Sequence, residues 1–345
     1  MTMGQCKLLN GKILGDYEQP YIIAELNSSH NGDLDVARKM IDAAAKAGCD
    51  CVKFQSWSVD SLYSKSYYRE NPIAKRFVKK FSLKPEQLKE LSVYCKEKGI
   101  DFSSTPYSEA EVDFLIDECH APFVKIASME LNNTEFLKYI GRKNVPVILS
   151  TGMGDFDEIL CAVDALQSSG NSDLALLHCV SLYPTRLETM NLNNISGLRK
   201  KFSGIPIGFS DHTADDAAAV AAVALGAAII EKHFTLDATK IGMDNGMAME
   251  AEPFEIMVNK CRNVFKGLGS ENRKVYPEEY KQREKMRRSI IVVRDLPAGH
   301  ILEHSDLYAK RPGTGIAPNR INDLVGKRLV CSVEADTLLS EDDFQ

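Results

Sequence analysis

Eight short apolar runs, separated by longer amphipathic segments, form the dominant pattern of the chain. Each run is rich in β-branched and other apolar residues, as is typical of strands that are covered on both faces. We therefore expect eight buried β-strands. The runs are residues 21–25, 51–56, 101–106, 123–128, 145–151, 174–180, 206–211 and 228–234.

The segments between these runs carry helical signals. Residues 33–48 and 85–99 are amphipathic, and they end at Gly48 and Gly99, a residue type that commonly follows a helix. Strands that alternate with helices pair in parallel, so eight such units predict an α/β fold, a (β/α)8 or TIM barrel. A doubly wound open sheet is the alternative, although no G-x-G-x-x-G motif follows the first run.

A long connection over residues 57–84 separates the second run from its helix. Loops of this length in a compact domain are usually lids or binding loops. The stretch YSKSYYRENP inside it is polar and aromatic. We therefore expect a flap over a polar ligand.

The composition changes after about residue 270. Residues 271–287 are highly charged, which predicts a solvated linker that is partly helical. Residues 288–345 hold short strand-like runs and several Pro and Gly turns, which predicts a small, mostly-β domain. We expect a catalytic barrel over 1–270, a linker over 271–287 and the second domain over 288–345.

Charge and cysteine content limit the classes of partner. The net charge is −6 and the sequence has no basic tract or membrane-length apolar run, so we expect neither nucleic acid nor membrane as a partner. The first residues do not match a signal peptide. The nine cysteines are scattered, which predicts free thiols in a cytoplasmic protein. We expect Cys161 and Cys179 in apolar surroundings.

Polar side chains gather where the eight runs end. The carboxyl ends of barrel strands carry the active site in enzymes of this fold, and a packed core would not place polar groups on every strand. In chain order these candidates are Glu25, Asn27, Lys53, Gln55, Ser104, Thr105, Lys125, Ser128, Glu130, Ser150, Thr151, His178, Ser181, Tyr183, Ser210, Asp211, His212, Glu231, Lys232 and His233.

Two pairs among these residues indicate specific chemistry. His212 and His233 end the last two strands, which are neighbours in a closed barrel, and two imidazoles with carboxylate and water suit Mn, Zn, Co or Fe. Lys53 and Lys125, with hydroxyls nearby, predict a cradle for phosphate and carboxylate. A lysine that forms a Schiff base, as in an aldolase, is the alternative.

Several motifs together resemble the sialic acid synthase, or NeuB-like, family. They are YIIAELNSSHNG, CVKFQ, FSSTP, KIAS, STGM, HCVSLYPT, GFSDHT and EKHFTLD. The tail, with LPAGHIL, KRPGTGI and VGKRL, is similar to the C-terminal SAF, or antifreeze-like, domain of that family. The resemblance covers essentially the whole chain.

The resemblance implies a metal-dependent synthase that condenses phosphoenolpyruvate with an open-chain amino-hexose, such as N-acetylmannosamine, and releases phosphate and a nine-carbon 2-keto acid. It implies a divalent ion on His212 and His233, usually Mn, with Mg or Co as alternatives. It also places Glu25 beside the metal and its water, and Asp244 in catalysis.

The resemblance further assigns binding residues by motif position. The implied phosphoenolpyruvate contacts are Lys53, Thr105, Lys125, Ser128, Ser150, Ser181 and Ser210. The implied sugar contacts are Gln55, Glu130, Tyr183, Asp244, Asn245 and Arg311. Arg311 would come from the SAF domain of a second copy, in a swapped homodimer.

Two departures from the family pattern bear on the acceptor. Ser181 stands where members often have Asn, and Asn245 stands where many have His. We expect Asn245 to influence acceptor choice, so a di-acetamido hexose leading to legionaminic or pseudaminic acid, or another aldose, is the alternative. Ice binding and a pure carbohydrate-binding module are not favoured, because the tail is basic and the strand ends carry lysines and histidines.

Overall fold

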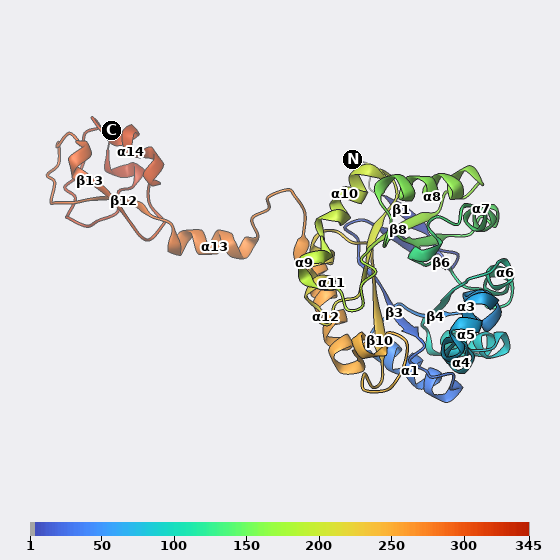
Figure 1. Cartoon of the computed structure of the whole chain (residues 1–345). Helices are drawn as coiled ribbons and strands as arrows, with labels where there is room; N and C mark the ends of the chain where they lie inside the picture. The colour runs from blue at the N-terminus through green and yellow to red at the C-terminus, as the bar shows by residue number, and fades with distance from the viewer. Residues whose placement is uncertain (1–3, 345) are drawn as a thin grey trace. The chain divides into compact units, whose positions relative to one another are not determined.

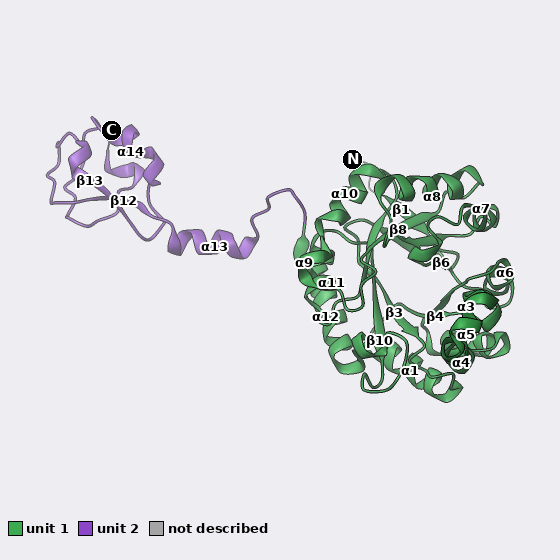
Figure 2. Ribbon diagram, viewed as in Figure 1, with its two compact units in different colours: residues 1–269 green, residues 270–345 purple. Residues whose placement is uncertain are grey.

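The computed structural model describes residues 4–344. The chain divides into two compact units, Met1–Gly269 and Ser270–Gln345 (Figure 2). Over the described residues, none of the helices combines the length and the apolar character needed to cross a membrane.

The first unit is a nearly closed barrel of eight parallel strands (Figure 1). Its strands are neighbours in the order β5, β4, β3, β10, β9, β8, β7, β6, and a Ser103 hydroxyl on β5 donates to the Phe123 carbonyl just before β6 at 3.3 Å. Each predicted apolar run overlaps one strand, so the predicted TIM barrel is confirmed. The strands are β3 (Tyr21–Asn27), β4 (Cys51–Gln55), β5 (Asp101–Thr105), β6 (Val124–Ile126), β7 (Val147–Ser150), β8 (Leu174–Cys179), β9 (Ile207–Asp211) and β10 (Ile229–Thr235).

Helices cover the outside of the barrel and bury their apolar faces against the strands. The first begins where Asp33 accepts hydrogen bonds from two backbone amides, and Gly99 ends another in the left-handed conformation. The larger helices are α1 (Leu34–Lys46), α5 (Pro85–Lys98), α6 (Glu109–Asp117), α7 (Thr134–Arg142), α8 (Phe156–Ser168), α10 (Asn193–Lys201), α11 (Ala217–Ala224) and α12 (Ala251–Leu268).

A helical insert, defined here as residues 59–81, occupies the connection that we expected to be a loop. It comprises α2 (Val59–Leu62), α3 (Lys65–Glu70) and α4 (Pro72–Phe81), so the expectation of a loop is wrong, while a role as a flap over a ligand stays a prediction. The physical reason is an apolar cluster: Tyr68, Val78 and Phe81 pack around Trp57. The polar residues that suggested a loop lie on the outer faces of these short helices.

An N-terminal hairpin closes the end of the barrel where the strands begin. It pairs β1 (Gln5–Lys7) with β2 (Ile13–Gly15), and its residues Leu8 and Leu14 join a buried cluster with interior residues of the strands. The sequence pattern did not predict this hairpin, because two three-residue strands show no usable periodicity. One end of the barrel is therefore sealed by apolar contacts, and polar groups are confined to the other.

The second unit is small and has its own core. A charged helix, α13 (Pro277–Met286), precedes the antiparallel pair β12 (Ser289–Val292) and β13 (Leu307–Lys310), and a short helix follows, α14 (Ile321–Leu324). Isolated bridges such as the one between Leu296 and Val333 join the remaining turns. The apolar cluster includes Ile290, Val292, Leu302, Leu324 and Leu339.

Asp306 is a buried carboxylate in the second unit. Its Oδ1 accepts hydrogen bonds from Arg294 Nη2 (2.6 Å) and Nε (3.0 Å), and its Oδ2 accepts from the Glu303 amide (2.9 Å) and lies 2.8 Å from His300 Nε2. Burial alone would raise the pKa of Asp306, but the Glu303, His300 and Arg294 hydrogen bonds outweigh burial and lower it to about 2.

We expect Asp306→Asn to destabilise the second unit by roughly 1–3 kcal/mol, because a buried carboxylate that accepts several hydrogen bonds is lost. Since the folded pKa is depressed, the contribution is present above the ordinary pKa of Asp and disappears as the pH falls towards about 2. Hydrogen exchange of the β12 and β13 amides reports this local stability. Asp336→Asn, which removes an exposed pair with Lys310, is the control and should change exchange little.

Candidate active site

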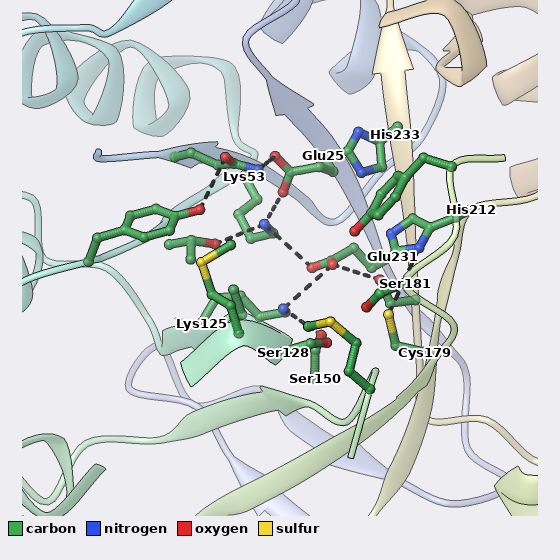
Figure 3. A pocket seen from close by; sticks show the side chains of 18 residues that line it. Glu25, Lys53, Lys125, Ser128, Ser150, Cys179, Ser181, His212, Glu231 and His233 are labelled. Atoms are coloured by element: carbon green, nitrogen blue, oxygen red, sulfur yellow. Dashed lines mark hydrogen bonds and ion pairs between the residues drawn. The ribbon is translucent and has the colours of Figure 1, made fainter. Parts of the chain in front are cut away.

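A cavity of about 290 Å³ lies at the carboxyl ends of the barrel strands (Figure 3). Successive strand residues alternate between the barrel interior and the helices, so Glu231 and His233 line the cavity while Lys232 between them pairs with Asp211 on the outer face at 2.7 Å. The cavity brings together thirteen predicted residues, namely Glu25, Lys53, Gln55, Thr105, Lys125, Ser128, Ser150, Ser181, Tyr183, Ser210, His212, Glu231 and His233.

Two buried lysines and two buried carboxylates form a continuous chain of charges across the cavity floor. Lys53 contacts Glu25 directly, and its Nζ lies 3.8 Å from Glu231 Oε2. Lys125 Nζ lies 3.6 Å from Glu231 Oε1. Figure 3 shows both ammonium groups pointing toward the same central space. The chain balances its own charge, which makes four ionised groups tolerable away from water.

Hydroxyl groups complete the surroundings of these charges. Lys53 Nζ donates to Thr105 Oγ1 at 3.0 Å, and Lys125 Nζ donates to Ser150 Oγ at 2.7 Å. Ser210 Oγ donates to Glu231 Oε1 at 3.0 Å. Hydroxyls can rotate to donate to an anion, so this arrangement suits a ligand that carries phosphate or carboxylate.

Burial sets the protonation of the central groups. It lowers the pKa of Lys53 to about 7, an effect that Glu231 opposes and the charge on Lys125 reinforces. For Glu231, burial would raise the pKa, but Lys125 and Lys53 outweigh burial and the pKa is lowered. Glu231 is therefore an anion at neutral pH, and burial makes the proton of Lys53 easier to lose than that of an exposed lysine.

The two histidines lie side by side on the opposite wall. Their ring centroids are 5.4 Å apart, and the Tyr183 ring lies 4.2 Å from that of His212. His212 Nδ1 lies 2.8 Å from the Val180 carbonyl oxygen, which fixes the ring, and Nε2 has no hydrogen-bond partner among residues 4–344. Burial and the neighbouring positive groups lower the pKa of His233 well below its usual value. A neutral His233 with free nitrogens is the state that binds a metal ion.

These residues fit a metal centre in which the protein supplies only some of the ligands. Within the described residues, no group of three or more His, Cys, Asp or Glu side chains is arranged to hold an ion. Glu25 is the register partner of His233 on the adjacent strand, and its Oε1 accepts from the Asn27 amide at 2.8 Å. The donor set therefore suits two imidazole ligands, with water or substrate oxygen in the remaining positions.

Gly152 allows two serine hydroxyls to approach each other. Its amide donates to Ser128 Oγ at 2.9 Å. A Cβ at position 152 would lie 2.3 Å from Ser181 Oγ and 2.8 Å from Ser128 Oγ, closer than real atoms come. Glycine is therefore required for these hydroxyls to face the same space beside Lys125.

Four of the residues that the family resemblance assigned to the site are not among the cavity-lining residues. The other strand-end candidates that do not line the cavity are Asn27, Ser104, Thr151, His178, Asp211 and Lys232. Glu130 accepts a hydrogen bond from Asn133 at 2.7 Å. Asp244 Oδ2 accepts from Asn27 Nδ2 at 2.9 Å, and burial raises the pKa of Asp244. Arg311 belongs to the second unit, so its assignment stays a prediction.

Asn245 holds a loop and does not line the cavity. Its Nδ2 donates to the Asp237 carbonyl at 2.9 Å and to the Lys240 carbonyl at 2.8 Å, and the side chain is only 2% exposed. The expectation of a direct sugar contact was based on sequence position and stays a prediction, although Asn245 is not among the residues that line the cavity. An effect of Asn245 on the acceptor through the adjacent Asp244 remains a prediction.

Sequence reasoning also missed residues of the cavity. Cys179 lines the cavity, and its Sγ lies 3.9 Å from His212 Nδ1. Cys161 is exposed. The prediction of apolar surroundings for both cysteines is therefore wrong.

Three more cavity-lining residues that the sequence did not predict are Tyr107, Met129 and Met153, which lie in the connections after strands. Tyr107 follows Thr105 by two residues in FSSTPY, so the polar strand end could have signalled it. Met129 and Met153 could not be predicted in this way, because the prediction used polar side chains and methionine is apolar.

Comparisons with known proteins agree with this geometry. A model of the NeuB family matches residues 40–273, and a model of the SAF domain matches residues 287–345. The N,N'-diacetyllegionaminic acid synthase of Legionella pneumophila is 38% identical, over 98% of this chain and 98% of its own length. The human N-acetylneuraminate-9-phosphate synthase is 33% identical, over 98% and 96%.

A solved structure is similar as well. It is the N-acetylneuraminic acid (sialic acid) synthetase of Leptospira borgpetersenii in complex with citrate, with a TM-score of 0.75 and 32% identity. The similarity covers 81% of this chain and 96% of that one.

We expect Gly152→Ala to weaken phosphoenolpyruvate binding about tenfold, because the new methyl group separates the Ser128 and Ser181 hydroxyls and removes the equivalent of one or two hydrogen bonds. Titration calorimetry measures the affinity. Gly267→Ala, on α12 with open space around the added atom, is the matched control and should bind as the unchanged protein does. Equal affinity of both variants would mean that the two hydroxyls do not contact the anion.

We also expect phosphoenolpyruvate affinity to fall as the pH rises above about 7, because Lys53 then loses its proton in the free protein. One linked proton gives a slope of at most about tenfold per pH unit. Phosphoenolpyruvate itself titrates, so the comparison is with Lys53→Arg, whose guanidinium stays charged and whose profile should be flatter. Superimposable profiles would show that Lys53 does not titrate in this range.

Proposed function

The chain belongs to the NeuB family, and on that premise we propose that it is a nonulosonic acid synthase that condenses phosphoenolpyruvate with an open-chain amino-hexose such as N-acetylmannosamine. The products are a nine-carbon 2-keto acid and phosphate. The alternative acceptor is a di-acetamido hexose, which the 38% identity to the Legionella pneumophila N,N'-diacetyllegionaminic acid synthase supports.

The observation that carries this proposal is the division of one cavity into two chemical halves. Lys53 and Lys125, with their hydroxyl partners, form a side suited to a phosphorylated carboxylate. His212 and His233 form a side suited to a metal ion. Phosphoenolpyruvate carries both anionic groups, and an aldehyde placed against the histidines would face its enol carbon.

On the donor side, the two lysines hold the anionic groups in place. Lys125 donates to Ser150, and the Ser128 and Ser181 hydroxyls at the Gly152 turn line the same cavity, which suits this side to phosphate. Because Lys53 and Lys125 are buried, their contacts with an anion are stronger than the same contacts in water. They also stabilise the phosphate when it departs with both electrons of the C–O bond.

On the acceptor side, His212 and His233 would hold a divalent ion, Mn in the first instance, with Mg or Co as alternatives. When bound, such an ion supplies Lewis-acid polarisation of the aldehyde oxygen. The enol carbon forms the new C–C bond, the aldehyde oxygen gains a proton, and water adds to the resulting cationic C2 with loss of a proton. The C2 hydroxyl then loses its proton as the C–O bond to phosphate breaks and phosphate takes the electron pair, which leaves the 2-keto group. Glu25, oriented by the Asn27 amide, is the carboxylate placed to orient that water and take its proton.

One observation supports a second candidate, a Schiff-base aldolase. A pKa of about 7 leaves part of Lys53 unprotonated at neutral pH, and an unprotonated amine is what imine formation requires. The contacts of Lys53 with Glu25 and Thr105 favour the ammonium form instead. Such an aldolase would use pyruvate and release no phosphate.

Assembly and location complete the proposal. The second unit is small for an independent domain, and we propose that Arg311 from one copy completes the sugar site of a second copy in a homodimer. We also propose a cytoplasmic location, which the nine unpaired cysteines support.

We expect phosphate release when phosphoenolpyruvate is mixed with the enzyme, Mn and one member of a sugar panel. The panel is N-acetylmannosamine, its 6-phosphate, and 2,4-diacetamido hexoses. Pyruvate with the same sugars should give no product. Condensation with pyruvate, together with an imine trapped on Lys53 by borohydride, would replace the synthase with the aldolase.

A further inference from the structure

Gln55 at the end of β4 is held by two hydrogen-bond donors from the connections that follow β4 and β5. Its Oε1 lies 2.7 Å from Trp57 Nε1 and 3.2 Å from the Tyr107 hydroxyl, and its Nε2 donates to Glu25 Oε1 at 3.3 Å. We propose that Trp57 and Tyr107 are positioning residues that fix the orientation of the Gln55 amide, and that the helical insert thereby controls acceptor binding. The second part rests on the proposed function.

The contacts of the Gln55 oxygen and those of the Gln55 nitrogen select the same one of the two possible amide orientations. An indole nitrogen can only donate, so the atom that faces Trp57 must be the amide oxygen. Burial raises the pKa of Tyr107, so its hydroxyl stays protonated and able to donate as well. If the amide were reversed, its NH2 group would face the indole N–H, and its oxygen would face the Glu25 carboxylate. Both contacts would then be repulsive.

This orientation leaves one amide hydrogen for a ligand. The Gln55 nitrogen carries two hydrogens, and within the described residues its one hydrogen bond is to Glu25. Gln55 lines the cavity, so the second hydrogen is available to a hydroxyl or acetamido oxygen of a sugar. The same amide also donates to Glu25, which connects acceptor binding with the carboxylate that orients water.

Trp57 connects this amide to the helical insert. Its side chain is 2% exposed and packs against Tyr68, Val78 and Phe81 of α3 and α4. Tyr107 packs against the same cluster, and its own amide donates to Glu111 at 2.6 Å. The insert is therefore packed around the donors that hold Gln55, and a change in its packing would be transmitted to the cavity.

The first test uses fluorescence, because Trp57 is the single tryptophan of the chain. Gln55→Met keeps the length of the side chain but removes the acceptor of the indole N–H. We expect the Trp57 emission of the free protein to shift to shorter wavelength. Ser150→Ala, across the cavity, is the control and should leave the emission unchanged. An unchanged spectrum of Gln55→Met would overturn the proposed contact.

The second test is a double-mutant cycle on the full-length enzyme, read as the KM of the panel sugar with the highest turnover. Trp57→Phe keeps a ring in the cluster and removes the donor. It should raise that KM about tenfold and leave the phosphoenolpyruvate KM within about twofold. In the Gln55→Met background, the same change should have almost no further effect on the sugar KM, because the amide it positions is gone.

Tyr107→Phe should give a smaller effect in the same direction, since its hydrogen bond is longer. Tyr94→Phe, which removes a hydroxyl bonded to Asp42 on the outer helices, is its matched control. If Trp57→Phe raises the sugar KM equally in the unchanged protein and in the Gln55→Met background, Trp57 acts only through packing and not through the Gln55 amide. If no sugar of the panel reacts, the proposed function fails while the fluorescence result still decides the contact.

Discussion

The structure depends on one constraint: the barrel interior has to accommodate ionised groups at one end while remaining apolar at the other. Lys53, Lys125, Glu25 and Glu231 are all nearly inaccessible to solvent. Such burial is tolerable because each charge has an opposite charge and a hydroxyl or amide within reach. The hairpin at the other end seals the interior with apolar side chains, so polar residues are concentrated at the carboxyl ends of the strands.

A buried ion pair is seldom the most stable way to fill a barrel, since well-packed apolar residues often do at least as well. The presence of these buried charges is therefore better explained by a role in ligand binding than by a contribution to the stability of the fold. Packing also provides the framework around them: glycine at position 152 brings two hydroxyls together, and the aromatic cluster of the helical insert holds Gln55. The same interior thus separates a side with two lysines from a side with two histidines.

Much of the fold and the site could be predicted from the sequence. Strands that are buried on both faces are recognisable as continuous apolar runs, and their parallel order places their carboxyl ends at the same end of the barrel. The predicted lysines, the histidines and most hydroxyls lie together for that reason. The rest depended on contacts between distant segments. The N-terminal hairpin is too short for a pattern, and the insert folds around Trp57, which local polarity concealed. The roles of Cys179 and Asn245 are set by which neighbours their side chains meet, and no spacing encodes that.

The central claim is that the buried charges serve the ligand, and the double variant Lys125→Met/Glu231→Gln tests it most directly. It removes one positive and one negative charge and keeps side chains of similar size. Thermal unfolding and calorimetric titration with phosphoenolpyruvate are measured on the same samples. The account predicts a melting temperature equal to or above that of the unchanged protein, together with loss of phosphoenolpyruvate binding. A lower melting temperature with phosphoenolpyruvate affinity retained would contradict it.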